Sequence, residues 1–302
     1  MLETNAKLRK LSVHNDKLYA LTDADIRQIQ TALLEMLKDF DAFCEKHGLR
    51  YVLCGGTALG AVRHKGFIPW DEDVDLAMPR VDYDRFEKLF AEEFGAVYHV
   101  QSIYSSEVYD LPFMKIRKKG TRFLELFEPE PEHAGIFIDI YPLENVPDFA
   151  PWRWFHGCIS DFLHLCCSCV RMKVKKERYF AYYDDPAFLR IVKVKIFLGK
   201  CLGFFSLNRW CKIADSWASG CKNNKSKRVS FPGGRKHYFG ELFSRQSALP
   251  PCKVAFEDIT LAAMADPEEY LSALYGDYSV IPPVEKRERH MILEFDLGEM
   301  NG

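Results

Sequence analysis

The sequence predicts a mixed sheet followed by a mostly helical region, a fold of the α/β or α+β class. Two observations predict it. In the first half, segments with helical periodicity alternate with short apolar strands. From residue 152 to about residue 222 the pattern is mostly helical and rich in aromatic and basic residues, and short strand-like pieces follow. We therefore divide the 302 residues into an α/β core with an N-terminal helix (1–147), a helical region (148–227) and a C-terminal segment (228–302).

Capping and spacing predict the first elements. Thr22 and Asp25 resemble a capping box, with Asp in place of the usual Glu or Gln. Apolar residues at helical spacing follow and predict an amphipathic helix over 23–47. A short strand is then expected over 50–54 ("RYVLC") and a short helix over 57–63.

The same two patterns predict the remaining elements. The core continues as strands interrupted by one further helix, and the C-terminal segment returns to short strands and one helix. The predicted strands cover 74–78, 97–104, 112–118, 135–141, 228–231, 237–239 and 252–256, and the predicted helices cover 82–94 and 267–275.

Composition limits the classes of function. The net charge of −2 gives no overall attraction to nucleic acid, so no nucleic-acid partner is expected. The opening residues "MLETNAKLRKLSVHNDK" lack the apolar core of a signal peptide, which predicts a cytoplasmic protein, either free or at the inner face of the cell membrane. Ten cysteines scattered through apolar segments predict buried thiols. Structural zinc is the weaker alternative, because "CCSC" at 166–169 lacks the usual ligand spacing.

Two apolar stretches, 158–170 and 191–205, raise the question of a membrane. Both are too short to span a bilayer, and charged residues interrupt them. Core helices are the favoured interpretation. A basic, aromatic helix resting on a bilayer surface is the alternative, which would make the protein a peripheral membrane protein.

Asp73-Val74-Asp75 is the first candidate for chemistry. Residues two apart in a strand point the same way, so both carboxylates face one side. Two like charges held that close favour a cation between them. Mg²⁺ or Mn²⁺ suits hard oxygen ligands and retains positions for substrate phosphates.

Two further features strengthen this interpretation. Gly55-Gly56 lies about 17 residues upstream, directly after a strand, where glycine lets the backbone approach a phosphate and the following helix start binds it. Asp139 lies inside the apolar strand "IFIDIY", where burial without a partner is costly. The ordinary alternative is that Asp73 and Asp75 are exposed turn residues and Asp139 is a satisfied core acid.

Gly-Gly, then two alternating aspartates, then a third Asp on a later strand is the pattern of the nucleotidyltransferase fold, the polymerase-β-like superfamily. Enzymes of that fold use two metal ions to clamp the attacking and leaving oxygens of a phosphoryl centre. The pattern therefore predicts Asp73, Asp75 and Asp139 as metal ligands and catalytic groups. Asp139 is also expected to accept the proton of the attacking hydroxyl.

A longer stretch is more specific. The sequence "GGTALGAVRHKGFIPWDEDVDLAMPRVDYDRF" (55–86) strongly resembles the LicD-type family of phosphocholine transferases, to which fukutin-type proteins are related. "LPFMKIRKKGT" (111–121), "IFIDIYPLE" (136–144) and "YLSALYGDYSVIPPVEKRERH" (270–290) resemble later blocks of the same family. The chain departs from the family pattern at Glu72, where Asp is usual and the charge is retained.

This resemblance implies a phosphotransferase for substituted phosphate groups. Its donor would be CDP-choline or a related CDP-alcohol. Its acceptor would be a sugar hydroxyl of a glycan, such as a lipopolysaccharide or teichoic acid, and this glycan could be lipid-linked when it is modified. CMP would be released. The C-terminal segment would complete the active site.

The resemblance also implies roles for individual residues. Gly55, Gly56 and Thr57 would cradle the donor phosphates. Further donor or phosphate contacts are expected from basic, histidine and aromatic side chains. For the tryptophan, core packing is an equal alternative. For the pair at 115 and 117, an ordinary solvated basic strand is the equal alternative. These residues are Arg63, His64, Lys65, Trp70, Lys115, Arg117, Arg287 and His290.

Three competing functions share part of the pattern. A glycosyltransferase also uses Asp-x-Asp to hold a nucleotide-sugar, but the upstream glycines and Asp139 disfavour it. A nucleotidyltransferase acting on a small molecule or a protein shares the three carboxylates, and the narrower family blocks disfavour it. A non-catalytic binding module is disfavoured because all three carboxylates are present.

Overall fold

The computed structural model describes residues 17–298, so most of the N-terminal stretch on which the export expectation rests lies outside it. A seven-stranded mixed sheet forms the centre, in the order β1-β2-β6-β4-β3, with β7 pairing with β6 and β8 with β7. Only β2 and β6 run parallel; the other pairs are antiparallel. The strands are β1 (Val52–Leu53), β2 (Asp75–Pro79), β3 (Tyr98–Gln101), β4 (Met114–Lys118), β6 (Phe137–Asn145), β7 (Arg228–Ser230) and β8 (Leu242–Ser244). The predicted mixed α and β fold is confirmed.

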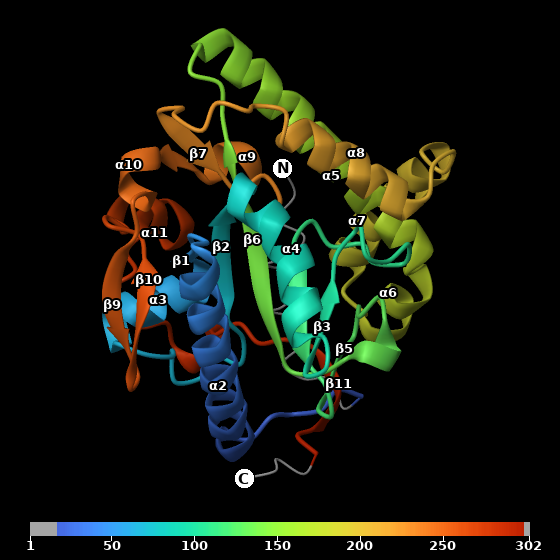
Figure 1. Ribbon diagram of the computed structural model, residues 1–302. Coiled ribbons are helices and arrows are strands. Elements are labelled where there is room, and N and C mark those ends of the chain that lie inside the picture. The colour runs from blue at the N-terminus through green and yellow to red at the C-terminus, as the bar shows by residue number, and fades with distance from the viewer. Residues whose placement is uncertain (1–16, 299–302) are drawn as a thin grey trace.

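Two helices, α2 (Asp23–His47) and α4 (Arg80–Phe94), cover one face of this sheet (Figure 1). The capping box of Thr22 and Asp25 is present at the start of α2. Phe43 meets Phe86 and Phe90 edge-on, with ring centroids 5.6 and 5.0 Å apart. This aromatic contact fixes the two helices together over the apolar face of the strands.

The opposite side of the sheet carries a two-stranded ribbon of β5 (Arg122–Glu125) and β11 (Ile292–Asp296). Neither strand was predicted, because each is short and its partner lies far away in the sequence. The predicted strand over 237–239 is wrong: the segment is the short helix α9 (His237–Gly240). His237 has a φ of 59°, which a strand does not allow.

The helical region consists of α5 (Ala150–Val174), α6 (Lys176–Tyr182), α7 (Pro186–Cys201) and α8 (Leu207–Ala218). Close approach is possible where α7 crosses α5, because a Cβ at Gly199 would lie 2.3 Å from the carbonyl oxygen of Cys169. All ten cysteines carry free thiols. Among residues 17–298, no helix has both the length and the apolar character needed to cross a bilayer.

The C-terminal segment adds an antiparallel hairpin and two helices beside the start of the core. The hairpin is β9 (Cys252–Phe256) with β10 (Ile259–Ala263). The helices are α10 (Arg245–Ala248) and α11 (Glu268–Tyr275), and α11 contacts α3 (Gly55–His64). The C-terminal segment thus lies next to the helix that begins with the glycine pair.

A buried arginine joins the core to the helical region. Arg80, the first residue of α4, is 6% exposed and donates from Nε to Glu144 Oε1 at 2.9 Å. Its Nη2 also donates to Asp215 Oδ1 on α8 at 2.7 Å. Because Glu144 is itself buried on β6, the guanidinium is the group that neutralises it.

Arg80→Ala is expected to lower the free energy of unfolding by about 3–5 kcal/mol, because it leaves Glu144 buried and unpaired. Urea denaturation measures the change. Lys46→Ala is the matched control, since Lys46 forms an exposed ion pair with Glu93 at 2.6 Å and its loss costs about 0–1 kcal/mol. Equal costs for the two variants would contradict this account of Arg80.

Candidate active site

The sheet face opposite α2 and α4 gathers charged side chains from three neighbouring strands. Asp75 on β2 lies directly beside Asp139 on β6, and Asp139 lies directly opposite Lys115 on β4. Side chains in register on neighbouring strands share a face, so these three converge. Lys115 Nζ is 3.0 Å from Asp139 Oδ1. Two predicted catalytic carboxylates therefore lie side by side, with a lysine against one of them.

Glu125 on β5 closes this group from the other side of the site. Its Oε2 accepts from Lys115 Nζ at 3.0 Å and from Arg117 Nη2 at 3.2 Å. The sequence reasoning missed this residue, although an acid alternating with apolar residues in "FLELF" carries the same signal that singled out Asp139. Glu125 thus orients the lysine that contacts Asp139.

Arg117 is fully buried and bonded to protein groups. It donates to Gln101 Oε1 at 2.6 Å, to the carbonyl oxygen of Gly135 at 2.8 Å and to the carboxylates of Glu125 and Glu128. The expected phosphate contact does not fit this environment, because all three guanidinium nitrogens are already bonded inside the protein. Arg117 instead supports the position of Glu125.

The environment shifts the pKa values of the two acids in opposite directions. Burial raises the pKa of Asp139 to about 6, against the opposing effect of Lys115. For Glu125, burial favours the neutral form, but Lys115, His290 and Arg117 outweigh it and lower the pKa. Asp139 is therefore mostly ionised at neutral pH and still basic enough to accept a proton.

The glycine pair at the start of α3 lies against the acidic residues. A Cβ on Gly55, whose φ is 51°, would lie 2.2 Å from Asp75 Oδ2, and a Cβ on Gly56 would lie 2.6 Å from Asp71 Oδ2. Gly56 N donates to Asp75 Oδ2 at 3.4 Å, and Thr57 Oγ1 accepts from Asp75 N at 2.9 Å. The glycines thus admit carboxylates to the helix start, at the place where the sequence predicted phosphates.

Asp71 belongs to the same acidic group. Its pKa is raised well above the usual value by burial, then by the charges of Asp73, Glu72 and Asp75. The nearby carboxyl group of Asp73 raises this pKa further through a side-chain hydrogen bond. Two carboxyl groups in contact require a shared proton or a cation. Asp71 therefore joins Asp73 and Asp75 as a candidate oxygen donor.

The C-terminal block reaches this acidic group through His290. Its backbone N donates to Glu72 Oε1 at 2.5 Å, and its Nδ1 is 3.3 Å from the same oxygen. Its Nε2 is 3.5 Å from Asp73 Oδ2 and 3.9 Å from Glu125 Oε1. Glu72, the departure from the family pattern, is thus the residue that anchors His290.

Arg287 lies over the face of Trp70, with the guanidinium carbon 3.8 Å from the ring centroid. Trp70 also packs partly against the main core. That indole face is therefore occupied by a cation of the protein itself. An approaching choline-like group would meet Arg287 there, so both residues lie at the edge of the site.

Arg63, His64 and Lys65 end α3 and connect it to the C-terminal block. Arg63 Nη1 donates to the carbonyl oxygen of Tyr278 at 2.9 Å, and its Nε donates to His64 Nε2 at 2.9 Å. Lys65 is exposed with a φ of 59°. Arg63 therefore has a structural partner, whereas the Lys65 side chain faces solvent.

A hard cation fits the donor chemistry of this group, but no metal site is preformed. Over residues 17–298, no three His, Cys, Asp or Glu side chains are placed to hold an ion. The carboxyl contact between Asp71 and Asp73, and the pairing of Asp75 with Asp139 across β2 and β6, supply clustered oxygen donors whose repulsion a cation would relieve.

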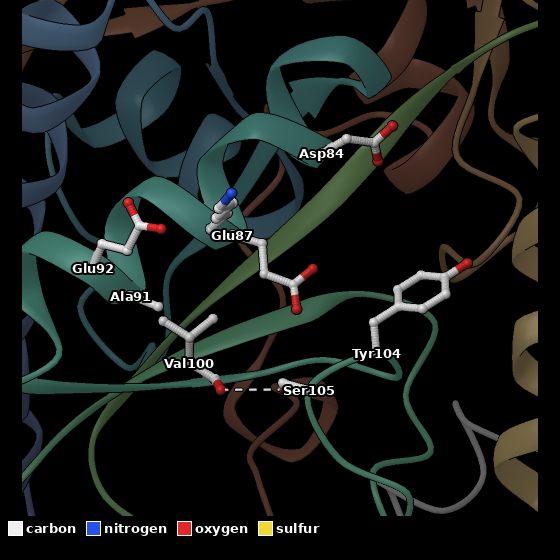
Figure 2. Close-up of a pocket in the computed structure, with 8 residues that line it drawn as sticks. Asp84, Glu87, Ala91, Glu92, Val100, Tyr104 and Ser105 are labelled. Atoms are coloured by element: carbon white, nitrogen blue, oxygen red, sulfur yellow. Dashed lines mark hydrogen bonds between the residues drawn. The ribbon is translucent and has the colours of Figure 1, made fainter.

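A separate hollow of about 500 Å³ lies along α4, lined by side chains that include Asp84, Glu87 and Tyr104 (Figure 2). Glu87 is not part of the site described above, because its carboxylate accepts a hydrogen bond from Ser102 Oγ. None of the lining residues is a predicted site residue. The candidate active site is therefore the acidic sheet face and not this hollow.

Comparisons with known proteins agree with the family resemblance. Residues 48–156 match the family described as LicD/FKTN/FKRP, nucleotidyltransferase domain. The lipopolysaccharide cholinephosphotransferase LicD of Haemophilus influenzae is 26% identical over 278 residues, which cover 89% of this chain and 97% of that protein. The human ribitol 5-phosphate transferase FKRP is 33% identical over 95 residues, 32% of this chain and 19% of that protein.

Gly55→Ala is expected to displace the Asp75 carboxylate and to destabilise the protein by more than the roughly 1–2 kcal/mol of left-handed backbone strain. Gly48→Ala is the matched control, because Gly48 has a φ of 61° and no neighbour within 4 Å of a new Cβ. Denaturation of both variants separates the contact with Asp75 from the strain. Equal losses of stability would show that the glycine is not needed for the carboxylate.

Proposed function

Because this chain belongs to the LicD-type family, we propose that it transfers phosphocholine, or a related phospho-alcohol, from a CDP-activated donor to a sugar hydroxyl of a cell-surface glycan. The observation that carries the proposal is the pairing of Asp75 and Asp139 beside the start of α3, with Lys115 against Asp139. The similarity to a cholinephosphotransferase over 89% of the chain supports phosphocholine as the transferred group.

The reaction forms one bond and breaks one. The sugar oxygen attacks the phosphorus that carries the alcohol, and the bond from that phosphorus to the bridging oxygen breaks. CMP leaves with the bonding electron pair. Asp139 accepts the proton of the sugar hydroxyl, which its pKa of about 6 permits at neutral pH. Lys115 holds Asp139 in place and balances its charge.

Asp73, Asp75 and Asp139 would hold Mg²⁺ or Mn²⁺, with Asp71 as a further oxygen donor. Such an ion supplies charge neutralisation at the diphosphate and orients the reacting oxygens. The start of α3 adds positive potential beside these carboxylates, and Gly56 N donates to Asp75 Oδ2. Lys65 is exposed at the opposite end of this helix, about 15 Å from its start, and is therefore not assigned to the phosphate site.

Asp139→Asn is expected to lower the rate of CMP release from CDP-choline, in the presence of a glycan acceptor, by roughly a hundredfold to ten-thousandfold, because an amide does not accept the proton. A coupled assay for CMP measures the rate. Asp258→Asn is the matched control, since Asp258 is an exposed carboxylate paired with Lys38. This variant should release CMP at the parent rate.

Several outcomes would contradict the proposed reaction. Parent-like CMP release by Asp139→Asn would remove Asp139 from the role of base. Sugar transfer from a UDP-sugar would identify a glycosyltransferase. Transfer of a nucleotidyl group from a nucleoside triphosphate to a small molecule or a protein would identify the nucleotidyltransferase alternative.

Mg²⁺ is expected to stabilise the protein, by about 2.7 kcal/mol when its concentration is a hundred times its dissociation constant. Asp75→Asn should lose most of this gain, yet be at least as stable as the parent in EDTA because one like charge is gone. Urea denaturation with Mg²⁺ and with EDTA measures both effects. A full Mg²⁺ gain in Asp75→Asn would exclude Asp75 as a ligand.

A further inference from the structure

The outward face of α7 and the loop after it expose large apolar side chains. Val194, Phe197 and Leu198 lie on successive turns of α7 and are 55%, 66% and 42% exposed. Phe204 and Phe205 follow in the loop at 66% and 41%. Several large apolar side chains exposed within one helix and the loop after it indicate a place of contact with something else.

The inward face of the same helix is already packed. Phe188 and Val192 are fully buried in a cluster with residues of α5 and α6. The Lys195 side chain is buried as well and donates to Ser168 Oγ on α5 at 2.9 Å. The helix therefore needs its inner face for the fold, and the outer apolar face contributes nothing to that packing.

The charge on this segment has a single sign. The sequence from 186 to 206 contains four basic residues and no Asp or Glu. Three of the four, Arg190, Lys193 and Lys200, are exposed. Figure 1 places α7 with α5 and α6 on the side of the molecule away from the β9–β10 hairpin. Exposed apolar and basic side chains thus occur together on α7 and the loop that follows it.

We propose that this surface docks the protein onto an anionic phospholipid bilayer. It consists of Arg190, Lys193, Val194, Phe197, Leu198, Lys200, Phe204 and Phe205, and we call it the α7 surface. The phenylalanines enter the boundary between headgroups and acyl chains, while the basic side chains meet lipid phosphates. The inference is independent of the proposed reaction and goes beyond it.

The physical chemistry favours lipid over a protein partner. The α7 surface carries positive charge only, and the negative surface potential of an anionic leaflet complements it. It is a convex helix face with a bulky aromatic loop, which inserts into a deformable lipid boundary without a matching groove. The helix lies in the membrane plane and does not cross it, consistent with the absence of a spanning helix among residues 17–298.

The test is sedimentation of the full chain with vesicles of phosphatidylcholine alone and with vesicles of equal parts phosphatidylcholine and phosphatidylglycerol. The parent should bind the anionic vesicles, and added salt should weaken the binding because it screens the charges. Lys193→Gln with Lys200→Gln should weaken binding to anionic vesicles by roughly thirtyfold.

Phe197→Ser with Phe204→Ser should weaken binding by at least about tenfold. Control variants lie elsewhere on the surface: Lys222→Gln with Lys225→Gln removes the same charges, and Val97→Ser with Val108→Ser removes smaller exposed apolar side chains. The two lysine pairs and the valine pair should keep the parent's melting curve by circular dichroism, since every side chain substituted in them is exposed. Phe204 also contacts the ring of Trp210, with centroids 5.5 Å apart, so the phenylalanine pair is compared only if its melting curve is retained.

Three results would overturn the proposal. One is absence of parent binding to the anionic vesicles at low salt. Another is parent-like binding by both α7 variants. Equal losses of binding in the α7 and control variants would also overturn it, because they would assign the attraction to overall charge. If the phenylalanine pair does not fold, the lysine pair still decides between the α7 surface and the control positions.

Discussion

The burial of several carboxylates on one face of a sheet is the constraint on which the rest of this structure depends. Asp75 and Asp139 lie side by side on β2 and β6, and Asp71 and Asp73 touch at the entry to β2. Like charges at such distances repel strongly once water is removed. Each neighbouring element supplies a group that reduces this cost: Lys115 from β4, and the backbone amides at the start of α3.

The same requirement explains why distant segments return to the sheet. Glu125 holds Lys115 and Arg117 from β5, and β5 is itself paired with β11. His290, two residues before β11, contacts Glu72 and Asp73. The chain around His290 is therefore held beside the acidic group by these polar contacts and by the β5–β11 ribbon. Changes there will affect the acidic group directly.

The candidate active site and the α7 surface lie in different parts of the molecule. The acidic face, α3 and the C-terminal block form one unit around Asp139. The helical region is tied to that unit through Arg80, Glu144 and Asp215, and it turns the apolar outer side of α7 away from the β9–β10 hairpin. In the proposed function, this division would let the α7 surface rest on a bilayer while the acidic face acts on the donor.

The sequence by itself determined the elements and residues that depend on local pattern. Helical period and capping indicated α2, and strand alternation predicted that Asp73 and Asp75 face the same side. Only the tertiary structure decided which groups surround them. The contacts of Glu125, His290 and Asp71, and the full burial of Arg117, join residues that no local pattern connects. Register across β2, β6 and β4, together with the return of the C-terminal segment, fixes those contacts through non-local pairing and charge balance.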